Sequence, residues 1–253
     1  MKIASWNVNS LRVRLPQVLD WLNTSQVDIL CLQETKTQDV DFPQEEIEDA
    51  GYRVVFSGQK TYNGVAILSK QSATDIITDI KNLDDPQRRI LAATIDDVRV
   101  INLYVVNGSE VGSEKFDYKL KWLDKVTQFV KQEIKKYKKL VVLGDFNITP
   151  DDRDVHDPEA WKGKILCSDK ERAAYQAMLD EGLKDTFRLF EQEEKAFSWW
   201  DYRGGGFRRN HGMRIDLILA TPALSTSCKQ SIIDKTPRTW ERPSDHTPVV
   251  AEF

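Results

Sequence analysis

The chain has 253 residues, of which 40% are hydrophobic and 30% are charged, and these proportions are typical of a soluble globular protein. They argue against collagen, a coiled coil and extensive disorder. The 40 Asp and Glu residues outnumber the 36 Lys and Arg residues, so the formal net charge is −4. A protein of this charge does not wrap nucleic acid with an overall basic surface. It would hold a polyanion through a local patch, aided by metal ions.

The chain carries no sign of export or membrane insertion. Cys31, Cys167 and Cys228 lie far apart and form no C-x-x-C pair, which is typical of a reducing compartment. No long apolar segment opens the sequence, so we expect no signal peptide, and the apolar run 140–143 is too short to cross a bilayer. No low-complexity linker divides the chain. We therefore expect a cytoplasmic monomer with no membrane partner, folded as a single domain over residues 1–253.

Short apolar segments that are rich in Val, Ile and Leu and bounded by Gly, Asn and Asp predict β-strands. In chain order they are 3–6, 29–32, 53–57, 65–68, 91–95, 98–105, 140–143, 215–219 and 248–253. Asp96 and Asp97 separate two of them and predict a tight hairpin. Apolar residues at helical spacing predict helices over 11–24, 113–138 and 168–181, with Ser113 as a cap. Many strands with few long helices indicate packed sheets covered by helices on the outside.

Polar side chains recur where the predicted strands end, and strand ends at one rim of a sheet can gather distant residues into one site. Most of their ligand atoms are oxygens, which suit Mg²⁺ or Mn²⁺. The sequence has neither the clustered His and Cys ligands of a zinc site nor the G-x-S-x-G elbow of a Ser-His-Asp hydrolase. The residues in question are Asn7, Gln33, Glu34, Asn107, Asp145, Asn147, Asp216, Asp245 and His246.

The segment Gly144-Asp145-Phe146-Asn147 is the most informative of these strand ends. In an extended segment Asp145 and Asn147 point the same way while Phe146 points to the core. Gly144 would let the chain approach a ligand closely. The structural alternative is an Asx turn before Thr149.

Residues 203–214 contain four arginines and no acidic residue, and they follow an aromatic segment over 197–202. Arginine contacts phosphates, and aromatic rings stack on bases, so this loop is a candidate DNA contact. A flexible glycine loop with solvated charges is the alternative. The basic stretch 131–139 lies along a predicted helix with Glu133, and we interpret it as a solvated face.

Seven segments together resemble the exonuclease III family of abasic-site endonucleases, within the endonuclease/exonuclease/phosphatase superfamily. They are SWNVNSLR (5–12), LQETK (32–36), LYVVNG (103–108), GDFNI (144–148), FSWWDYR (197–203), MRID (213–216) and SDH (244–246). The resemblance runs from Lys2 to the end of the chain. It implies a four-layer α/β sandwich, with two packed mixed β-sheets flanked by helices and the site at one rim of the paired sheets.

The resemblance implies a Mg²⁺ cofactor, for which Mn²⁺ can substitute. Glu34 is then the principal carboxylate ligand, with Asn7 beside it, and Asp245 completes the acidic cluster. Asn9 stands where some family members carry Asp, so the sequence leaves the number of metal ions open. The full set of expected metal-contacting residues is Asn7, Glu34, Asp145, Asn147, Asp245 and His246.

The resemblance also assigns catalytic and DNA-binding roles. Asp145 orients or deprotonates the attacking water, and Asn147 helps to fix that water or the phosphate. His246, held by Asp216, contacts the phosphate, with Tyr104 as a further donor. The expected DNA-binding residues are Trp199, Met213 and Ile215 around the base-less sugar, together with Arg203, Arg208, Arg209 and Arg214. The segment 151–161 with His156 matches no role in the family.

The implied activity is metal-dependent hydrolysis 5′ to abasic sites in duplex DNA, leaving a 3′-hydroxyl, with 3′–5′ exonuclease activity and 3′-end trimming as companions. The expected partner is duplex DNA with abasic sites or blocked 3′ ends, because a flipped abasic nucleotide is extracted at little cost. One alternative is a phosphoesterase acting on inositol phosphates, sphingomyelin or undamaged DNA, which the segment 199–216 disfavours. Another is a non-catalytic nucleic-acid-binding relative, which would be expected to lose part of the acidic set. The balance of endonuclease to exonuclease activity is not readable from the sequence.

Overall fold

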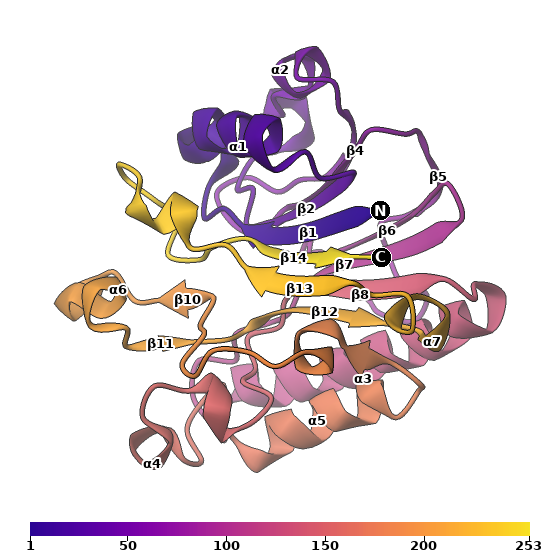
Figure 1. Ribbon diagram of the computed structural model, residues 1–253. Coiled ribbons are helices and arrows are strands. Elements are labelled where there is room, and N and C mark those ends of the chain that lie inside the picture. The colour runs from indigo at the N-terminus through magenta and orange to yellow at the C-terminus, as the bar shows by residue number, and fades with distance from the viewer.

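The computed structural model describes residues 1–253 and contains two six-stranded sheets packed face to face (Figure 1). The first sheet consists, in spatial order, of β13 (Gln230–Ile233), β14 (Val249–Glu252), β1 (Lys2–Asn7), β2 (Ile29–Gln33), β4 (Val65–Ser69) and β3 (Arg53–Ser57). The second consists of β5 (Ala73–Ile77), β6 (Ile90–Ile95), β7 (Val98–Tyr104), β8 (Leu140–Asp145), β12 (Asp216–Ala220) and β9 (Lys184–Asp185). Both sheets are mixed, because β1 runs parallel to β2 and β7 parallel to β8 while all other neighbours are antiparallel.

Helices cover the outer face of each sheet. In Figure 1, α1 (Leu11–Ser25) and α2 (Gln44–Asp49) lie above the first sheet, and α3 (Glu114–Lys136) and α5 (Asp169–Leu179) lie below the second. Strands buried on both faces can be apolar throughout, which explains the continuous Val, Ile and Leu runs of β2, β4, β6 and β8. The predicted four-layer α/β sandwich is therefore confirmed. No helix combines the length and apolar character needed to cross a membrane.

All of the predicted strands and helices are present, with ends shifted by a few residues at most. Ser113 caps α3 by accepting a hydrogen bond from the Phe116 amide at 3.2 Å, and Asp96 and Asp97 form the β6–β7 turn with Asp96 at φ 51°. The sequence missed several short elements. They are β5, β9, β13, β10 (Trp199–Trp200), β11 (Gly212–Met213), α2, α4 (Pro158–Trp161), α6 (Gly206–Arg209) and α7 (Pro222–Ser225).

Gly144 serves the sheet rather than a ligand. Its φ is 141°, and a Cβ at this position would lie 1.8 Å from the carbonyl oxygen of Leu103 on the neighbouring strand β7. The close approach that this glycine permits is therefore to the neighbouring strand. The missing side chain lets β8 pack closely on β7 and so fixes where Asp145 leaves the sheet.

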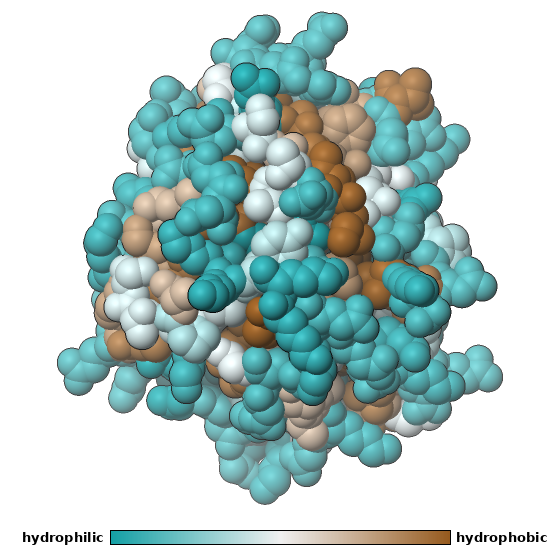
Figure 2. Space-filling view, turned by 90° about the vertical axis from the view of Figure 1, so that its right-hand side faces the viewer, coloured by the Kyte–Doolittle hydropathy of each residue, from teal (hydrophilic) through white to brown (hydrophobic).

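The two ends of the sandwich differ in character. Figure 2 views the end that lies at the right of Figure 1, where hydrophilic side chains dominate and a band of hydrophobic atoms runs between them. Exposed apolar atoms of this kind are ordinary on a folded surface. The opposite end, at the left of Figure 1, carries β10, β11 and α6, and the polar strand ends gather there.

Candidate active site

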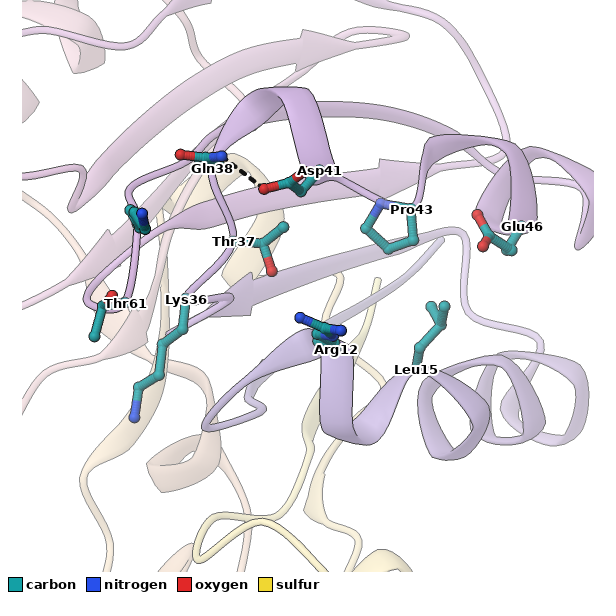
Figure 3. Close-up of a pocket in the computed structure, with 10 residues that line it drawn as sticks. Arg12, Leu15, Lys36, Thr37, Gln38, Asp41, Pro43, Glu46 and Thr61 are labelled. Carbon is teal, nitrogen blue, oxygen red and sulfur yellow. Dashed lines mark hydrogen bonds between the residues drawn. The ribbon is translucent and has the colours of Figure 1, made fainter.

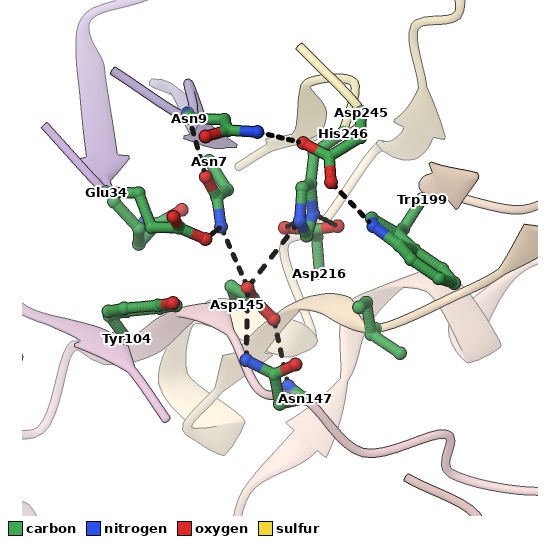
Figure 4. A network of polar contacts seen from close by, with 12 residues as sticks. Asn7, Asn9, Glu34, Tyr104, Asp145, Asn147, Trp199, Asp216, Asp245 and His246 are labelled. Carbon is green, nitrogen blue, oxygen red and sulfur yellow. Dashed lines mark hydrogen bonds and ion pairs between the residues drawn. The ribbon is translucent and has the colours of Figure 1, made fainter. Parts of the chain in front are cut away.

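The sheet topology brings the polar strand ends to one rim. β1 and β2 are parallel and end at Asn7 and Gln33, while β7 and β8 are parallel and end at Tyr104 and Asp145. Antiparallel β12 begins at Asp216, directly opposite Asp145 in the register. Antiparallel β14 starts after His246, beside the end of β1. Side chains far apart in sequence therefore face one another, as Figure 4 shows.

His246, Asp216 and Asp145 form a buried row. The Nδ1 of His246 lies 2.9 Å and 3.1 Å from the two carboxylate oxygens of Asp216, and its Nε2 lies 3.7 Å from Oδ2 of Asp145 (Figure 4). The three residues are 4% exposed or less. The Asp216 contact fixes the ring orientation and keeps a proton on Nδ1, so only Nε2 faces the site.

Burial and charge shift the titration of this row. Burial alone lowers the pKa of His246, but Asp216 and Asp145 more than offset that effect and raise the pKa to about 10. Burial raises the pKa of Asp145 to about 7, although the positive charge of His246 opposes the shift. The site thus holds a cationic imidazole beside a carboxyl group that titrates near neutrality, which suits general acid–base chemistry.

Asn7 connects the carboxylates of the two sheets. Its Nδ2 donates to Oε1 of Glu34 at 2.8 Å and to Oδ2 of Asp145 at 2.9 Å. Glu34 follows β2 in the left-handed region at φ 51°, and Lys36 lies 2.9 Å from its other carboxylate oxygen. Tyr104 lies beside Glu34. Burial and the negative charge of Glu34 raise the pKa of the Tyr104 hydroxyl well above 10. Tyr104 therefore remains a neutral hydrogen-bond donor.

The segment after β8 is not extended as expected. Asn147 has φ 48°, and its amide donates to Oδ1 of Asp145 at 2.9 Å, which makes an Asx turn at Asp145 itself. The turn still aims both side chains into the site, because Nδ2 of Asn147 lies 3.3 Å from Oδ2 of Asp145. Phe146 is 1% exposed and points to the core, as expected.

Glu34, Asp145 and His246 offer ligand atoms that all lie within 4.8 Å of one another. The two carboxylates fit a hard divalent cation, whereas His246 could ligate it only after losing the proton from Nε2. Asp245 was expected in this set, but the structure does not bring it there. Its carboxylate accepts hydrogen bonds from Nδ2 of Asn9 at 2.9 Å and from Nε1 of Trp199 at 3.0 Å.

Metal affinity should depend on pH through Asp145. A protonated carboxyl group cannot ligate a cation, so a proton competes with the metal below the pKa of about 7. We expect the divalent-cation concentration for half-maximal activity to rise by roughly tenfold per pH unit as the pH falls below 7, and to level off above it. Rates measured over a divalent-cation series at several pH values check this. A midpoint that stays constant across neutrality would contradict the assignment of Asp145 as a ligand.

Lys119 is a buried charge beneath the site that the sequence did not single out. Its ammonium group donates to the carbonyl oxygens of Asn107 at 3.0 Å and Asn147 at 2.7 Å, and it pairs with the buried carboxylate of Glu171. It therefore fixes two of the loops that reach the site. The signal was a lysine on the buried stripe of α3, one turn after Phe116, where an apolar residue would be ordinary.

The predicted DNA-binding arginines differ in their surroundings. Arg214 is 1% exposed, and its guanidinium pairs with Asp154 at 2.6 Å and Asp185 at 2.8 Å, so its assignment as a DNA contact is wrong. Arg203 is exposed but pairs with Asp201 at 2.7 Å. The two that remain exposed without such a partner are Arg208 and Arg209, on α6.

Trp199 is half-buried, whereas Met213 and Ile215 are 0% and 2% exposed and form an apolar cluster beneath it. Trp199 alone of these three reaches the surface beside His246, with ring centroids 6.5 Å apart. The structure thus makes Met213 and Ile215 a floor under Trp199 rather than an open pocket wall.

A second basic surface adjoins Glu34 and was not predicted. A cleft of about 610 Å³ lies between the start of α1 and the loop after β2 (Figure 3). Arg12, Lys36 and Lys60 line it together with Asp41 and Glu46. Lys36 lines this cleft and also pairs with Glu34, so the cleft adjoins the candidate metal site.

Comparisons with known proteins agree with this geometry. Residues 4–246 match the model of the endonuclease/exonuclease/phosphatase family. The chain is 38% identical over 266 aligned positions to exodeoxyribonuclease III of Haemophilus influenzae, an alignment that covers 100% of both proteins.

Solved structures of similar proteins also agree with this geometry. The 3′ phosphatase NExo from Neisseria, determined with a product DNA hairpin, is 50% identical and superposes with a TM-score of 0.98, covering 100% of this chain and 99% of that one. An AP endonuclease from Archaeoglobus fulgidus is 39% identical with a TM-score of 0.96 and the same coverage. The chain therefore belongs to the exonuclease III and AP endonuclease branch of the endonuclease/exonuclease/phosphatase family, and it is an exonuclease III-like DNA-repair nuclease.

Proposed function

We propose that this enzyme hydrolyses the phosphodiester bond 5′ to an abasic site in duplex DNA and leaves a 3′-hydroxyl. The observation that carries the proposal is the Asp216–His246–Asp145 row beside Glu34, with His246 Nε2 3.7 Å from Asp145. Phosphodiester hydrolysis needs an activated water and a positive partner for the charge that develops on the phosphate. The row supplies both within one buried site.

In this proposal Asp145 takes a proton from the attacking water. Without the cation its pKa is raised to about 7, so it is a stronger base than an exposed carboxylate. His246 donates from Nε2 to a phosphate oxygen, while Asp216 holds Nδ1. Tyr104 and Asn147 add neutral donors on the side of β7 and β8.

Glu34, Asp145 and the nearby Asn7 and Asn147 would hold or surround the cation, which we propose to be Mg²⁺, with Mn²⁺ as a substitute. The ion would withdraw charge from the phosphate. Asp245 is not a direct ligand in this proposal, because its two carboxylate oxygens accept hydrogen bonds from Asn9 and Trp199. Asp245 then orients Trp199 toward the sugar.

The basic residues of α6 should contribute to DNA binding, since the protein as a whole carries a formal charge of −4. We expect the double variant Arg208→Ala/Arg209→Ala to weaken duplex binding at low salt and to reduce the slope of log K against log salt by about one unit per lost phosphate contact. Binding measured over a salt series checks this. The matched variant Arg12→Ala/Lys60→Ala reports on the cleft of Figure 3. An unchanged slope in the first variant and a reduced slope in the second would move the DNA path to that cleft.

A second candidate function is removal of 3′-phosphates or 3′-terminal nucleotides without incision at abasic sites. It is favoured by the 50% identity to NExo, whose solved structures describe a 3′ phosphatase and a 3′–5′ exonuclease. Both candidates require attack on a phosphorus atom next to a 3′ oxygen. They differ in whether the active site can accommodate the DNA strand that continues on the 3′ side of the attacked phosphate.

The deciding experiment compares three labelled substrates: a duplex with one internal abasic analogue, a nicked duplex with a 3′-phosphate, and an intact duplex end. Each is incubated with Mg²⁺ or with excess chelator. We expect incision of the first substrate and 3′-hydroxyl products throughout, all abolished by the chelator. Rapid 3′-phosphate release without abasic incision would select the second candidate. Activity in chelator would overturn the metal assignment.

A further inference from the structure

The segment 151–161, to which the family resemblance gives no role, lies next to the active site through a row of paired backbone segments. Three pairings place His246, Trp199, Met213 and Val155 next to one another on adjacent backbone segments: His246 with Trp199, Trp199 with Met213, and Met213 with Val155. Adjacent strands lie about 4.8 Å apart, so Val155 is about 14 Å from His246 along this row. The residue after Val155 is His156.

His156 stacks on His211 at the end of this row. The ring centroids are 4.9 Å apart and the planes differ by 12°. The amide and Nδ1 of His156 both contact the carbonyl oxygen of Gly212, at 3.1 Å and 3.2 Å, and the amide of His211 donates to Gly206 at 2.9 Å. Backbone hydrogen bonds therefore anchor both residues, and the stack is organised before any ligand binds.

The two rings of the stack differ in exposure. His156 is half-buried, and Trp161 meets it edge-on with ring centroids 6.4 Å apart. His211 is exposed. His156 covers one face of the His211 ring, so a further ring could stack only on the outer face of His211. An aromatic face of this kind, backed by a second ring, is a surface on which another flat ring can stack.

Cationic side chains lie near the stack. Arg208 and Arg209, at the end of α6, stand three and two residues before His211, and Lys164 lies 5.9 Å from the centroid of the Trp161 ring, which meets His156. Aromatic rings set between cationic side chains are the common means by which proteins hold unpaired nucleic acid, with phosphates on the cations and bases on the rings. The stack shares its apolar base with the catalytic end, since Trp161 and Trp199 pack on the same cluster with Met213.

We propose that the outer face of His211, backed by His156, stacks an unpaired nucleobase of the DNA substrate. The proposal rests on the proposed function, since it takes DNA as the substrate. Val155, the residue before His156, lies about 14 Å from His246, a distance of about four base-pair steps. Two bases in such a substrate lack a partner: the base opposite an abasic site and the last base of a frayed 3′ end. The ligand chemistry is the same for both.

The test places 2-aminopurine, whose fluorescence falls on stacking, at each of these two positions in separate duplexes. Binding is measured in the Asp145→Asn background and in chelator, so that turnover is negligible during the measurement. We expect the fluorescence of at least one duplex to fall on binding. His211→Ala should abolish that fall and weaken binding to the same duplex by at least about fivefold, because a stacked base contributes that much. The position that responds identifies which base is bound.

The matched control is His211→Phe, which keeps a flat ring and removes the imidazole. It should restore the fluorescence change and the affinity, and a stacking role alone predicts this rescue. If His211→Ala keeps the parental signal, or if neither duplex responds, the stack is only a contact between two loops. Abasic incision by the parent enzyme is scored separately. If the parent enzyme does not incise abasic DNA but the fluorescence still falls on binding, the proposed abasic function is wrong and the stacking proposal stands. If the parent incises abasic DNA but the fluorescence does not change, only the stacking proposal is wrong.

Discussion

Asp145→Asn is expected to lower the single-turnover rate of phosphodiester hydrolysis by about 10²- to 10⁴-fold while DNA affinity stays close to that of the parent. Asp145 is 1% exposed, and its Oδ2 faces both Asn7 at 2.9 Å and His246 at 3.7 Å. An asparagine matches the shape of this carboxylate but cannot take a proton from water. The substitution also removes one negative charge next to the cation. The loss of rate should therefore exceed that caused by misplacing the side chain alone.

The substitution has a structural cost that must be measured beside the rate. The carboxylate accepts from the amide and the side chain of Asn147 as well as from Asn7, and an amide nitrogen in its place leaves donors facing one another. We expect a stability loss of about 1–3 kcal/mol, read from the thermal midpoint. Asp20→Asn, an exposed carboxylate on α1, is the matched control. If Asp145→Asn turns over within tenfold of the parent at saturating Mg²⁺, proton transfer belongs to another residue.

The sequence predicted the architecture well because its strands carry a strong local signal. A strand covered on both faces must be apolar along its length, so β2 and β8 were visible as runs of Val, Leu and Ile. The missed strands lack that signal. β5 is an edge strand whose central residues are exposed, and β10 and β11 have two residues each. Their existence depends on a neighbouring chain, which no local pattern records.

The candidate site residues were noticed for a different reason. Most of them border an apolar run, and the resemblance then proposed a role for each. The roles of buried charges were not predictable, because their partners are remote. Arg214 is read locally as part of a basic loop, yet Asp154 and Asp185 hold it from 60 and 29 residues away. A charge cannot be assigned to solvent or to a buried pair until the fold brings its partner near.

The His246–Asp216 pair is expected to act as one unit in catalysis. Asp216→Ala removes the carboxylate that orients Nδ1 at 2.9 Å, and His246→Ala removes the donor that the carboxylate serves. Each variant should lose about 10²-fold or more in turnover, since each disables the same proton donor. The double variant should then lose much less than the product of the two single effects, with a coupling of about 1–3 kcal/mol. Rates for all four proteins at saturating DNA and Mg²⁺ complete the cycle, and simple additivity would contradict the pairing.

The pH profile separates a catalytic pair from a merely structural one. Asp216 and Asp145 raise the pKa of His246 to about 10, so the parent keeps a charged imidazole from neutral pH up to that value and loses it above. Asp216→Asn retains a hydrogen-bonding side chain but removes a negative charge, which lowers the pKa of His246. The imidazole then loses its proton at a lower pH, and the alkaline fall in activity should move toward neutrality by a unit or more, at roughly 1.4 kcal/mol per unit. The control is Asp234→Asn. Asp234 accepts a hydrogen bond from Trp21 and lies away from the site, so this substitution should leave the pH profile unchanged. A profile that keeps its shape in Asp216→Asn while the rate drops uniformly would mean that Asp216 only holds the ring and does not set its charge.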